Sequence, residues 1–164
     1  MQPTTLPADA PVCETSDLRL RQRLTGSLMN QPFSIVVVTN VRAGACALHG
    51  YPTISAAWAG TRRVGIRVRN GFVFEADDPG SHRFVVPPQG TAWFAVGTAM
   101  ADEGRPLITF TRLAIAVTPG TSVSSSAEVA VALGSTALKG MPYGITVTAF
   151  APGTGPVYAD SGNT

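Results

Sequence analysis

The sequence is poor in charge and in cysteine. Only 13% of its 164 residues are charged, compared with about 25% in an average soluble domain. The formal net charge of +2 is too small to indicate a nucleic-acid partner. No stretch approaches the roughly 20 consecutive apolar residues that a transmembrane helix requires. A membrane-spanning segment and a strongly basic nucleic-acid-binding surface are therefore not expected.

Motifs of common enzymes are missing as well. The sequence has no G-x-S-x-G nucleophile elbow, phosphate-binding loop, H-E-x-x-H pair or dinucleotide-binding glycine pattern. The paired acids at 77–78 and 102–103 stand beside proline or glycine, which is typical of turns. We therefore predict no catalytic residue, metal site or cofactor, and expect that the protein is not an enzyme. The alternative is a secreted hydrolase with catalytic residues on loops, which requires His49 or His82 beside a serine, cysteine or acid.

Turn formers and short apolar segments are abundant. The chain has 17 glycines and 13 prolines. "DLRLRQRL" (17–24) alternates apolar residues with arginine, which predicts a strand with one solvated face. "FSIVVVTN" (33–40) is almost continuously apolar and β-branched, which is typical of a central strand buried on both faces. "TAWFAVGT" (91–98) predicts a strand with Ala92, Phe94 and Val96 on one face. Further strands are predicted over 53–58, 63–70, 82–87, 111–118, 127–133 and 144–150.

About eight or nine short strands and no long helix indicate an all-β protein. We predict an Ig-like antiparallel β-sandwich, with a small barrel as the alternative. The domain is expected to span 13–150, between flexible tails at 1–12 and 151–164. The first twelve residues lack the charged start and apolar stretch of a signal peptide. They are typical of the polar segment that follows a removed signal, although an intracellular protein is the competing interpretation.

The two cysteines, Cys13 and Cys46, have several possible roles. A zinc site needs about four ligands, and the chain offers only two cysteines and two histidines. A catalytic cysteine needs a histidine and an orienting partner; His49 is near Cys46, but "HGYP" is typical of a turn that carries it away. An even cysteine count in an exported chain favours a Cys13–Cys46 disulfide. We predict this bond.

The order of these segments resembles a known family. "VCETSDLRL", "FSIVVVTN", "GACALHGYPTI" and "VVPPQGTAWFAVGT" are similar to the actinobacterial exported domain of unknown function 4232, between Cys13 and Phe150. The resemblance implies an Ig-like sandwich, export and a place at the cell envelope, and it carries over no catalytic residue. The matching positions are Cys13, Thr39, Asn40, Cys46, Leu48, Gly50, Tyr51, Pro52 and Gly90.

Arginine is the residue type that suggests a binding surface. Guanidinium groups bind phosphate and carboxylate groups well, so an anion-binding or partner-binding surface is possible if the strands share one sheet. The competing interpretation is that outward strand positions are polar and that arginine discourages edge-to-edge pairing. The aromatic residues Tyr51, Trp58 and Trp93 could form a sugar platform, but aromatics more often anchor sandwich cores. The arginines concerned are Arg19, Arg21, Arg23, Arg62, Arg63, Arg67 and Arg69.

The sequence thus predicts a secreted or envelope-associated, monomeric sandwich of unknown molecular activity. We expect a non-enzymatic binding or structural module, whose partner is an envelope polymer, a lipid or a protein.

Overall fold

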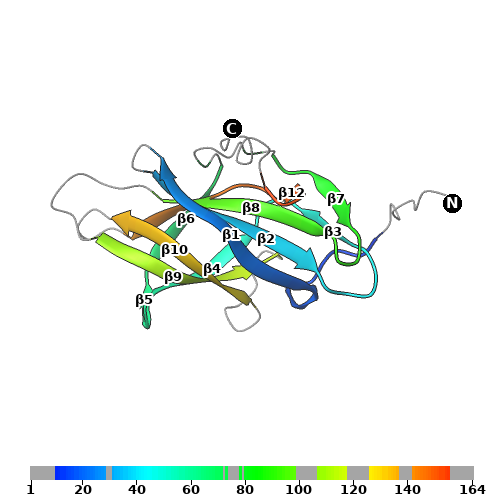
Figure 1. Ribbon diagram of the computed structural model, residues 1–164, viewed down its shortest axis with the longest axis horizontal. Helices are drawn as coiled ribbons and strands as arrows, with labels where there is room; N and C mark the ends of the chain where they lie inside the picture. The colour runs from blue at the N-terminus through cyan, green and yellow to red at the C-terminus, as the bar shows by residue number, and fades with distance from the viewer. Residues whose placement is uncertain are drawn as a thin grey trace.

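Two β-sheets packed face to face form the body of the computed structural model (Figure 1). The structure describes residues 10–28, 31–71, 73, 78, 80–98, 107–117, 126–136 and 142–155. The larger sheet has the order β1 (Leu18–Leu28), β2 (Gln31–Asn40), β8 (Thr91–Gly97), β11 (Tyr143–Val147) and β6 (Ile66–Asn70), and β12 (Ala151–Pro152) also pairs with β8. The second sheet has the order β10 (Ala127–Thr136), β9 (Leu107–Ala116), β4 (Thr53–Ala59) and β5 (Arg62–Val64).

A third, two-stranded sheet lies at the end of the sandwich nearest the N-terminus (Figure 1). It pairs β3 (Cys46–His49) with β7 (Arg83–Val86) in antiparallel register. A short 3-10 helix, η1 (Thr15–Asp17), precedes β1. No helix of the described residues is long and apolar enough to span a bilayer.

The core lies between the two large sheets and follows the alternation in the sequence. Phe94 of β8 and Phe150 meet edge to face in this core, with ring centroids 5.6 Å apart. Trp93 and Ala95, the next residues of β8 on the opposite face, belong to a second apolar cluster with Ile35. Because the middle of the larger sheet is covered on both faces, β2 is apolar at consecutive positions rather than alternate ones.

The two sides of the sandwich, where the edge strands of the sheets meet, are built differently. On one side, β1 and β10 each have a bulge, and side chains of β1 bind the backbone of β10. The Gln22 Oε1 atom accepts hydrogen bonds from the Ala132 N–H (3.0 Å) and the Ser34 hydroxyl (2.8 Å), and the Thr25 hydroxyl donates to the Ala132 carbonyl (2.7 Å). These bonds close the sandwich at that side.

On the other side the chain itself crosses between the sheets. β5 is the edge strand of the smaller sheet, β6 is the edge strand of the larger sheet, and Gly65 alone separates them. β5 pairs with only the last three residues of β4, 57–59. The first half of β4 therefore has no strand partner on this side among the described residues.

The predicted all-β sandwich with one disulfide is confirmed, with differences in detail. About eight or nine strands were predicted, and the described residues form twelve. Gly65 splits the predicted 63–70 strand into β5 and β6, and β3 and β12 were missed. The strand pairs of the described residues are antiparallel, as predicted, except that β6 and β11 run parallel. Ala10 is buried and β12 pairs with β8, so the predicted tails were drawn too long; residues 1–9 and 156–164 lie outside the described residues.

Candidate functional site

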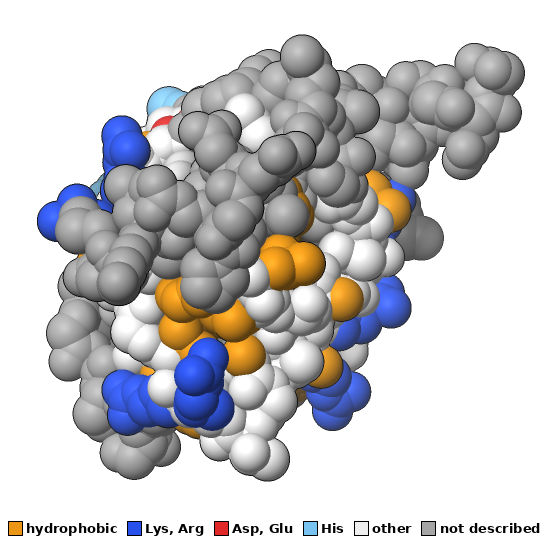
Figure 2. Space-filling view, turned by 90° about the vertical axis from the view of Figure 1, so that its left-hand side faces the viewer, with side chains coloured by type: hydrophobic (Ala, Val, Ile, Leu, Met, Phe, Trp, Pro, Cys, Tyr) orange, Lys and Arg blue, Asp and Glu red, His pale blue; other side chains and the backbone are white. Residues whose placement is uncertain are grey.

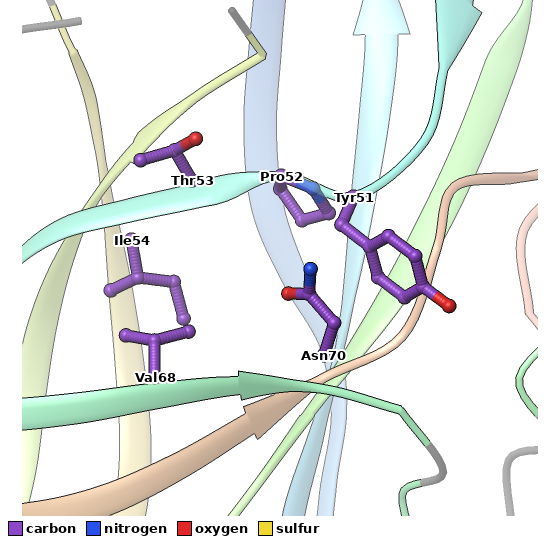
Figure 3. A pocket seen from close by; sticks show the side chains of 6 residues that line it. All are labelled: Tyr51, Pro52, Thr53, Ile54, Val68 and Asn70. Carbon is purple, nitrogen blue, oxygen red and sulfur yellow. The ribbon is translucent and has the colours of Figure 1, made fainter. Parts of the chain in front are cut away.

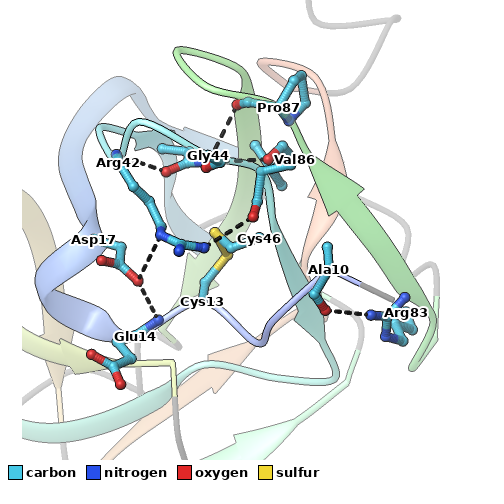
Figure 4. The surroundings of a disulfide bond; sticks show 12 residues. Ala10, Cys13, Glu14, Asp17, Arg42, Gly44, Cys46, Arg83, Val86 and Pro87 are labelled. Atoms are coloured by element: carbon cyan, nitrogen blue, oxygen red, sulfur yellow. Dashed lines mark hydrogen bonds and ion pairs between the residues drawn. A yellow bond between two sulfur atoms is a disulfide. The ribbon is translucent and has the colours of Figure 1, made fainter. Parts of the chain in front are cut away.

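Cys13 and Cys46 form the predicted disulfide (Figure 4). Their Cα atoms are 4.9 Å apart, and both residues are completely buried. The chain before Cys13 runs parallel to β3: the Cys13 N–H donates to the Ala47 carbonyl (2.8 Å), and the Ala47 N–H donates to the Pro11 carbonyl (2.7 Å). Both sulfur atoms are used in the bond, so neither cysteine is available as a metal ligand or a nucleophile.

Asn40, at the end of β2, is a completely buried polar residue that orders the loops beside the disulfide. Its Nδ2 group donates to the carbonyls of Gly44 (3.0 Å) and Val86 (3.1 Å). Its Oδ1 atom accepts from the Arg42 N–H at 2.9 Å. A buried amide that is satisfied in this way fixes the conformation of every segment that it contacts.

The backbone of Asn40 is hydrogen-bonded to the β7–β8 turn. Its N–H donates to the Gly90 carbonyl (3.0 Å), and its carbonyl accepts from the Gln89 N–H (2.8 Å). A Cβ atom at Gly90 would lie 2.8 Å from the Pro87 carbonyl oxygen, so only glycine fits this turn. The asparagine and the glycine of the family resemblance therefore serve one structural purpose.

Three segments meet at the "HGYP" turn: 49–51, residue 78 with 80–81, and 148–150. Gly50 has a φ of 76°, a conformation that favours glycine. Its carbonyl accepts a hydrogen bond from the Phe150 N–H at 2.9 Å. The segment therefore fastens the end of β3 to the chain that follows β11.

Asp78 lies at the centre of this junction. Its proline and glycine neighbours had suggested a solvated turn residue, and that interpretation was wrong. Asp78 accepts hydrogen bonds from the Tyr51 hydroxyl and from the N–H groups of Gly80 (3.1 Å) and Ala149 (3.2 Å). Partial burial pushes the pKa of Asp78 upward, but these three donors outweigh it and hold the pKa below its ordinary value of 3.8. The hydrogen bond to Asp78, then burial and the carboxylate charge, raise the pKa of Tyr51.

His49 lies 3.2 Å, measured from Nε2, from the Ser81 hydroxyl oxygen. This is the contact that the hydrolase alternative requires, but both residues are exposed. A catalytic serine also needs a group that orients the histidine and donors that stabilise an oxyanion. Within the part of the chain that is described, no third residue bonds to His49. His49 borders a cavity of about 260 Å³ beside the disulfide, and Ser81 does not line it.

No cluster of three or more possible metal ligands occurs among the residues that the structure describes.

The seven arginines occupy the larger sheet and the adjoining β5 but do not form one continuous surface. Arg19 and Arg21 on β1, and Arg67 and Arg69 on β6, occupy the outward positions of their strands and are exposed. These two strands are the opposite edges of one sheet, with β2, β8 and β11 between them. The remaining arginines are Arg23 on β1, whose Nη1 atom would lie 2.9 Å from a Cβ atom at Gly155, and Arg62 and Arg63 on β5.

The three aromatic residues do not form a platform. Trp93 is buried and Tyr51 belongs to the loop junction. Trp58 is half-buried on β4, where the Arg112 guanidinium carbon lies 4.1 Å from the centroid of its ring, a cation–π contact. Each aromatic residue thus has a separate structural environment.

A second cavity, of about 420 Å³, lies on the open side of the sandwich between β4 and β6 (Figure 3). Ile54 and Val68 point toward one another across it, and the Asn70 amide lies beside Pro52 and Tyr51. The alternation of 63–70 indicates that Val68 points inward, but the pairing of Val68 with Ile54 depends on how the two sheets stack. The sequence therefore gave no signal for this cavity.

Fold and site together define a disulfide-bonded β-sandwich domain whose recognisable motif residues join loops to one another. The chain belongs to the family described as Domain of unknown function (DUF4232), whose model matches residues 13–151. No curated protein and no solved structure matches the chain.

Proposed function

We propose that this protein is exported and acts at the cell envelope as a non-enzymatic binding module. The observation that carries the proposal is the disulfide, which closes a 33-residue separation and is completely buried. Disulfides of this kind persist in oxidising compartments and are rare in the reducing cytosol. An Ig-like topology and an actinobacterial origin belong to the same proposal.

The binding role is supported by the chemistry of the surface. The outward arginines of β1 and β6 present guanidinium groups that suit phosphate and carboxylate ligands. Envelope polymers, lipid headgroups and acidic proteins carry these groups. Several residues that the family resemblance singles out, namely Cys13, Asn40, Cys46, Gly50, Tyr51 and Gly90, make bonds that join segments of the fold. The arginine-bearing strand edges are therefore a chemically distinctive surface outside that motif.

Cysteine mapping in the native host tests export. Free thiols are alkylated in intact cells, and the remainder is alkylated with a second reagent after reduction. We expect Cys13 and Cys46 to react only after reduction, in protein recovered from outside the cytoplasm. Reduced cysteines in cytoplasmic protein would contradict the proposal.

Binding is tested by co-sedimentation of the disulfide-bonded protein with isolated envelopes at low and high salt. We expect salt-sensitive retention, because surface electrostatic attraction is screened by ions. Retention that is indifferent to salt and to charge reversal at the arginines would argue against an anionic ligand.

The hydrolase alternative rests on the His49–Ser81 contact. A serine-directed phosphonate probe tests it, with Ser81→Ala as the control. We expect no labelling that depends on Ser81, because both residues are exposed and no third residue bonds to His49 among the described residues. Labelling that the substitution abolishes would favour the hydrolase.

A further inference from the structure

The edge of β6 that faces β4 has backbone groups that pair with no strand of the described residues. The Tyr143 N–H donates to the Gly65 carbonyl (3.1 Å), and the Gly71 N–H donates to the Val147 carbonyl (2.9 Å), so Gly65 and Gly71 direct their backbone groups toward β11. Backbone groups alternate between the two edges of a strand. The N–H and carbonyl groups at positions 66, 68 and 70 therefore face the opposite edge, where no described strand pairs with β6.

The cavity of about 420 Å³ lies along this free edge. Its volume falls within the roughly 300–1,000 Å³ that is usual for ligand sites. Ile54 and Val68 form an apolar surface in it, and the Asn70 side chain, which is exposed, adds an amide donor and acceptor (Figure 3). An extended chain on this edge could place an apolar side chain in the cavity while its backbone pairs with β6.

The charged residues of β5 and β6 are all basic. Arg67 and Arg69 project from β6, Arg62 and Arg63 project from β5, and all four are exposed. None of them pairs with a carboxylate of the residues that the structure describes; the two ion pairs found there use Arg42 and Arg112. Figure 2 shows one end of the molecule, on which hydrophobic side chains lie near basic ones. This surface is complementary to acidic groups.

From the free edge, the cavity and the four arginines, we infer that the open side of the sandwich binds an extended acidic peptide segment of a partner protein, which adds to β6 as a further strand. The backbone of the peptide pairs with positions 66, 68 and 70, an apolar side chain occupies the cavity over Ile54 and Val68, and acidic side chains contact Arg67 and Arg69. The inference deepens the binding role proposed above and rests on it. Export is tested separately by cysteine mapping, so a failure of the export proposal can be distinguished from a failure of the peptide inference.

Arginines on an edge strand also discourage edge-to-edge aggregation. That role accounts for the charge of β6 but not for an apolar cavity with an amide beside it. The opposite edge of the same sheet provides a comparison: β1 carries outward arginines too, yet its neighbour β10 is fastened to it through Gln22 and Thr25. The two edges therefore carry similar charge. They differ because only the β6 edge, among the described residues, has an apolar cavity and unpaired backbone groups beside its arginines.

Fluorescence anisotropy with short labelled peptides tests the inference on the full, disulfide-bonded chain. The probe alternates valine and glutamate; one control replaces glutamate by lysine, and another keeps the charge but has proline at alternate positions. We expect binding of the first peptide only. Proline removes N–H donors that a β-ladder requires, so this control tests strand addition without altering the protein. If the proline peptide or polyphosphate binds as tightly as the probe, the surface takes anions as such and the inference is wrong.

Protein variants locate the site. Charge reversal in Arg67→Glu/Arg69→Glu is expected to weaken binding about tenfold or more, since electrostatic complementarity becomes repulsion. The matched Arg19→Glu/Arg21→Glu variant makes the same charge change at the far edge and should stay within about twofold. Asn70→Trp, which fills the cavity from an exposed position, should also abolish binding, and thermal unfolding checks that each variant is folded. Equal loss in both charge variants, or undiminished binding by the tryptophan variant, would overturn the inference.

Discussion

Replacing Asn40 by alanine removes a completely buried side chain that is hydrogen-bonded to buried and half-buried backbone groups. The amide donates to two carbonyls, at 3.0 and 3.1 Å, and accepts from one N–H at 2.9 Å. Each such bond contributes about 1 kcal/mol net, and a buried group left unpaired costs about 1–3 kcal/mol. We expect Asn40→Ala to lower the free energy of unfolding by about 3–5 kcal/mol, a large part of the roughly 5–15 kcal/mol typical of a domain.

Asn40→Asp distinguishes the hydrogen bonds from simple packing. The substitution keeps the acceptor but sets a second oxygen against two carbonyls, in a site where burial raises the pKa of the introduced carboxyl. The charged form is destabilising, so the deficit should shrink as pH falls from neutral and the group becomes protonated. The deficit of Asn40→Ala should not change in this way.

Urea-induced unfolding, followed by tryptophan fluorescence, measures both variants. Asn70→Ala is the matched control, because Asn70 is exposed and should change stability by less than about 0.5 kcal/mol. A loss below about 1 kcal/mol for Asn40→Ala, or an equal loss for Asn70→Ala, would refute the role given to Asn40.

Three further predictions concern the disulfide, the loop junction and the β7–β8 turn. Cys13→Ala/Cys46→Ala should lower the free energy of unfolding by roughly 3–4 kcal/mol, from the entropy of the loop that the bond closes; calorimetry of the oxidised and reduced protein provides the comparison. Because the pKa of Asp78 is held below its ordinary value, its contribution to stability is present above pH 3.8 and is lost as pH falls through the folded-state pKa; Asp78→Asn should remove that part of the acid dependence in an equilibrium unfolding series, and an unchanged dependence would count against the junction. Gly90→Ala should cost roughly 1–3 kcal/mol by overpacking, while Gly144→Ala, with no atom within 4 Å of the added carbon, should be close to neutral in the same denaturation assay.

Most of the fold prediction was based on the alternation of apolar and polar residues. The exposed arginines of β1, the continuously buried β2 and the two-faced β8 follow directly from the spacing of their apolar residues. β3 was missed because three of its four residues are buried in succession, and a short apolar segment beside a glycine-proline turn has no strand period. The parallel pairing of β6 with β11 depends on the order of strands in the sheet, which no local pattern contains.

Contacts between distant residues lay beyond the sequence. Asp78 stands in a "DDPGS" segment that is typical of a solvated turn, but its partners Tyr51 and Ala149 come from other loops. The cavity between Ile54 and Val68 likewise depends on residues that are distant in the sequence. In contrast, the Cys13–Cys46 bond was predictable, because two cysteines allow only one pairing.

That covalent bond also determines how the domain responds to mechanical tension. Force applied to the chain before Cys13 passes through the sulfur atoms directly to Cys46, since the two residues are covalently linked. The segment between the two cysteines, which are 33 residues apart, contains β1 and β2. This segment lies outside the covalent path of the force, so its strands are not pulled from the sheet one after the other. A stretched, oxidised domain should lengthen by roughly 110 Å less than a reduced one.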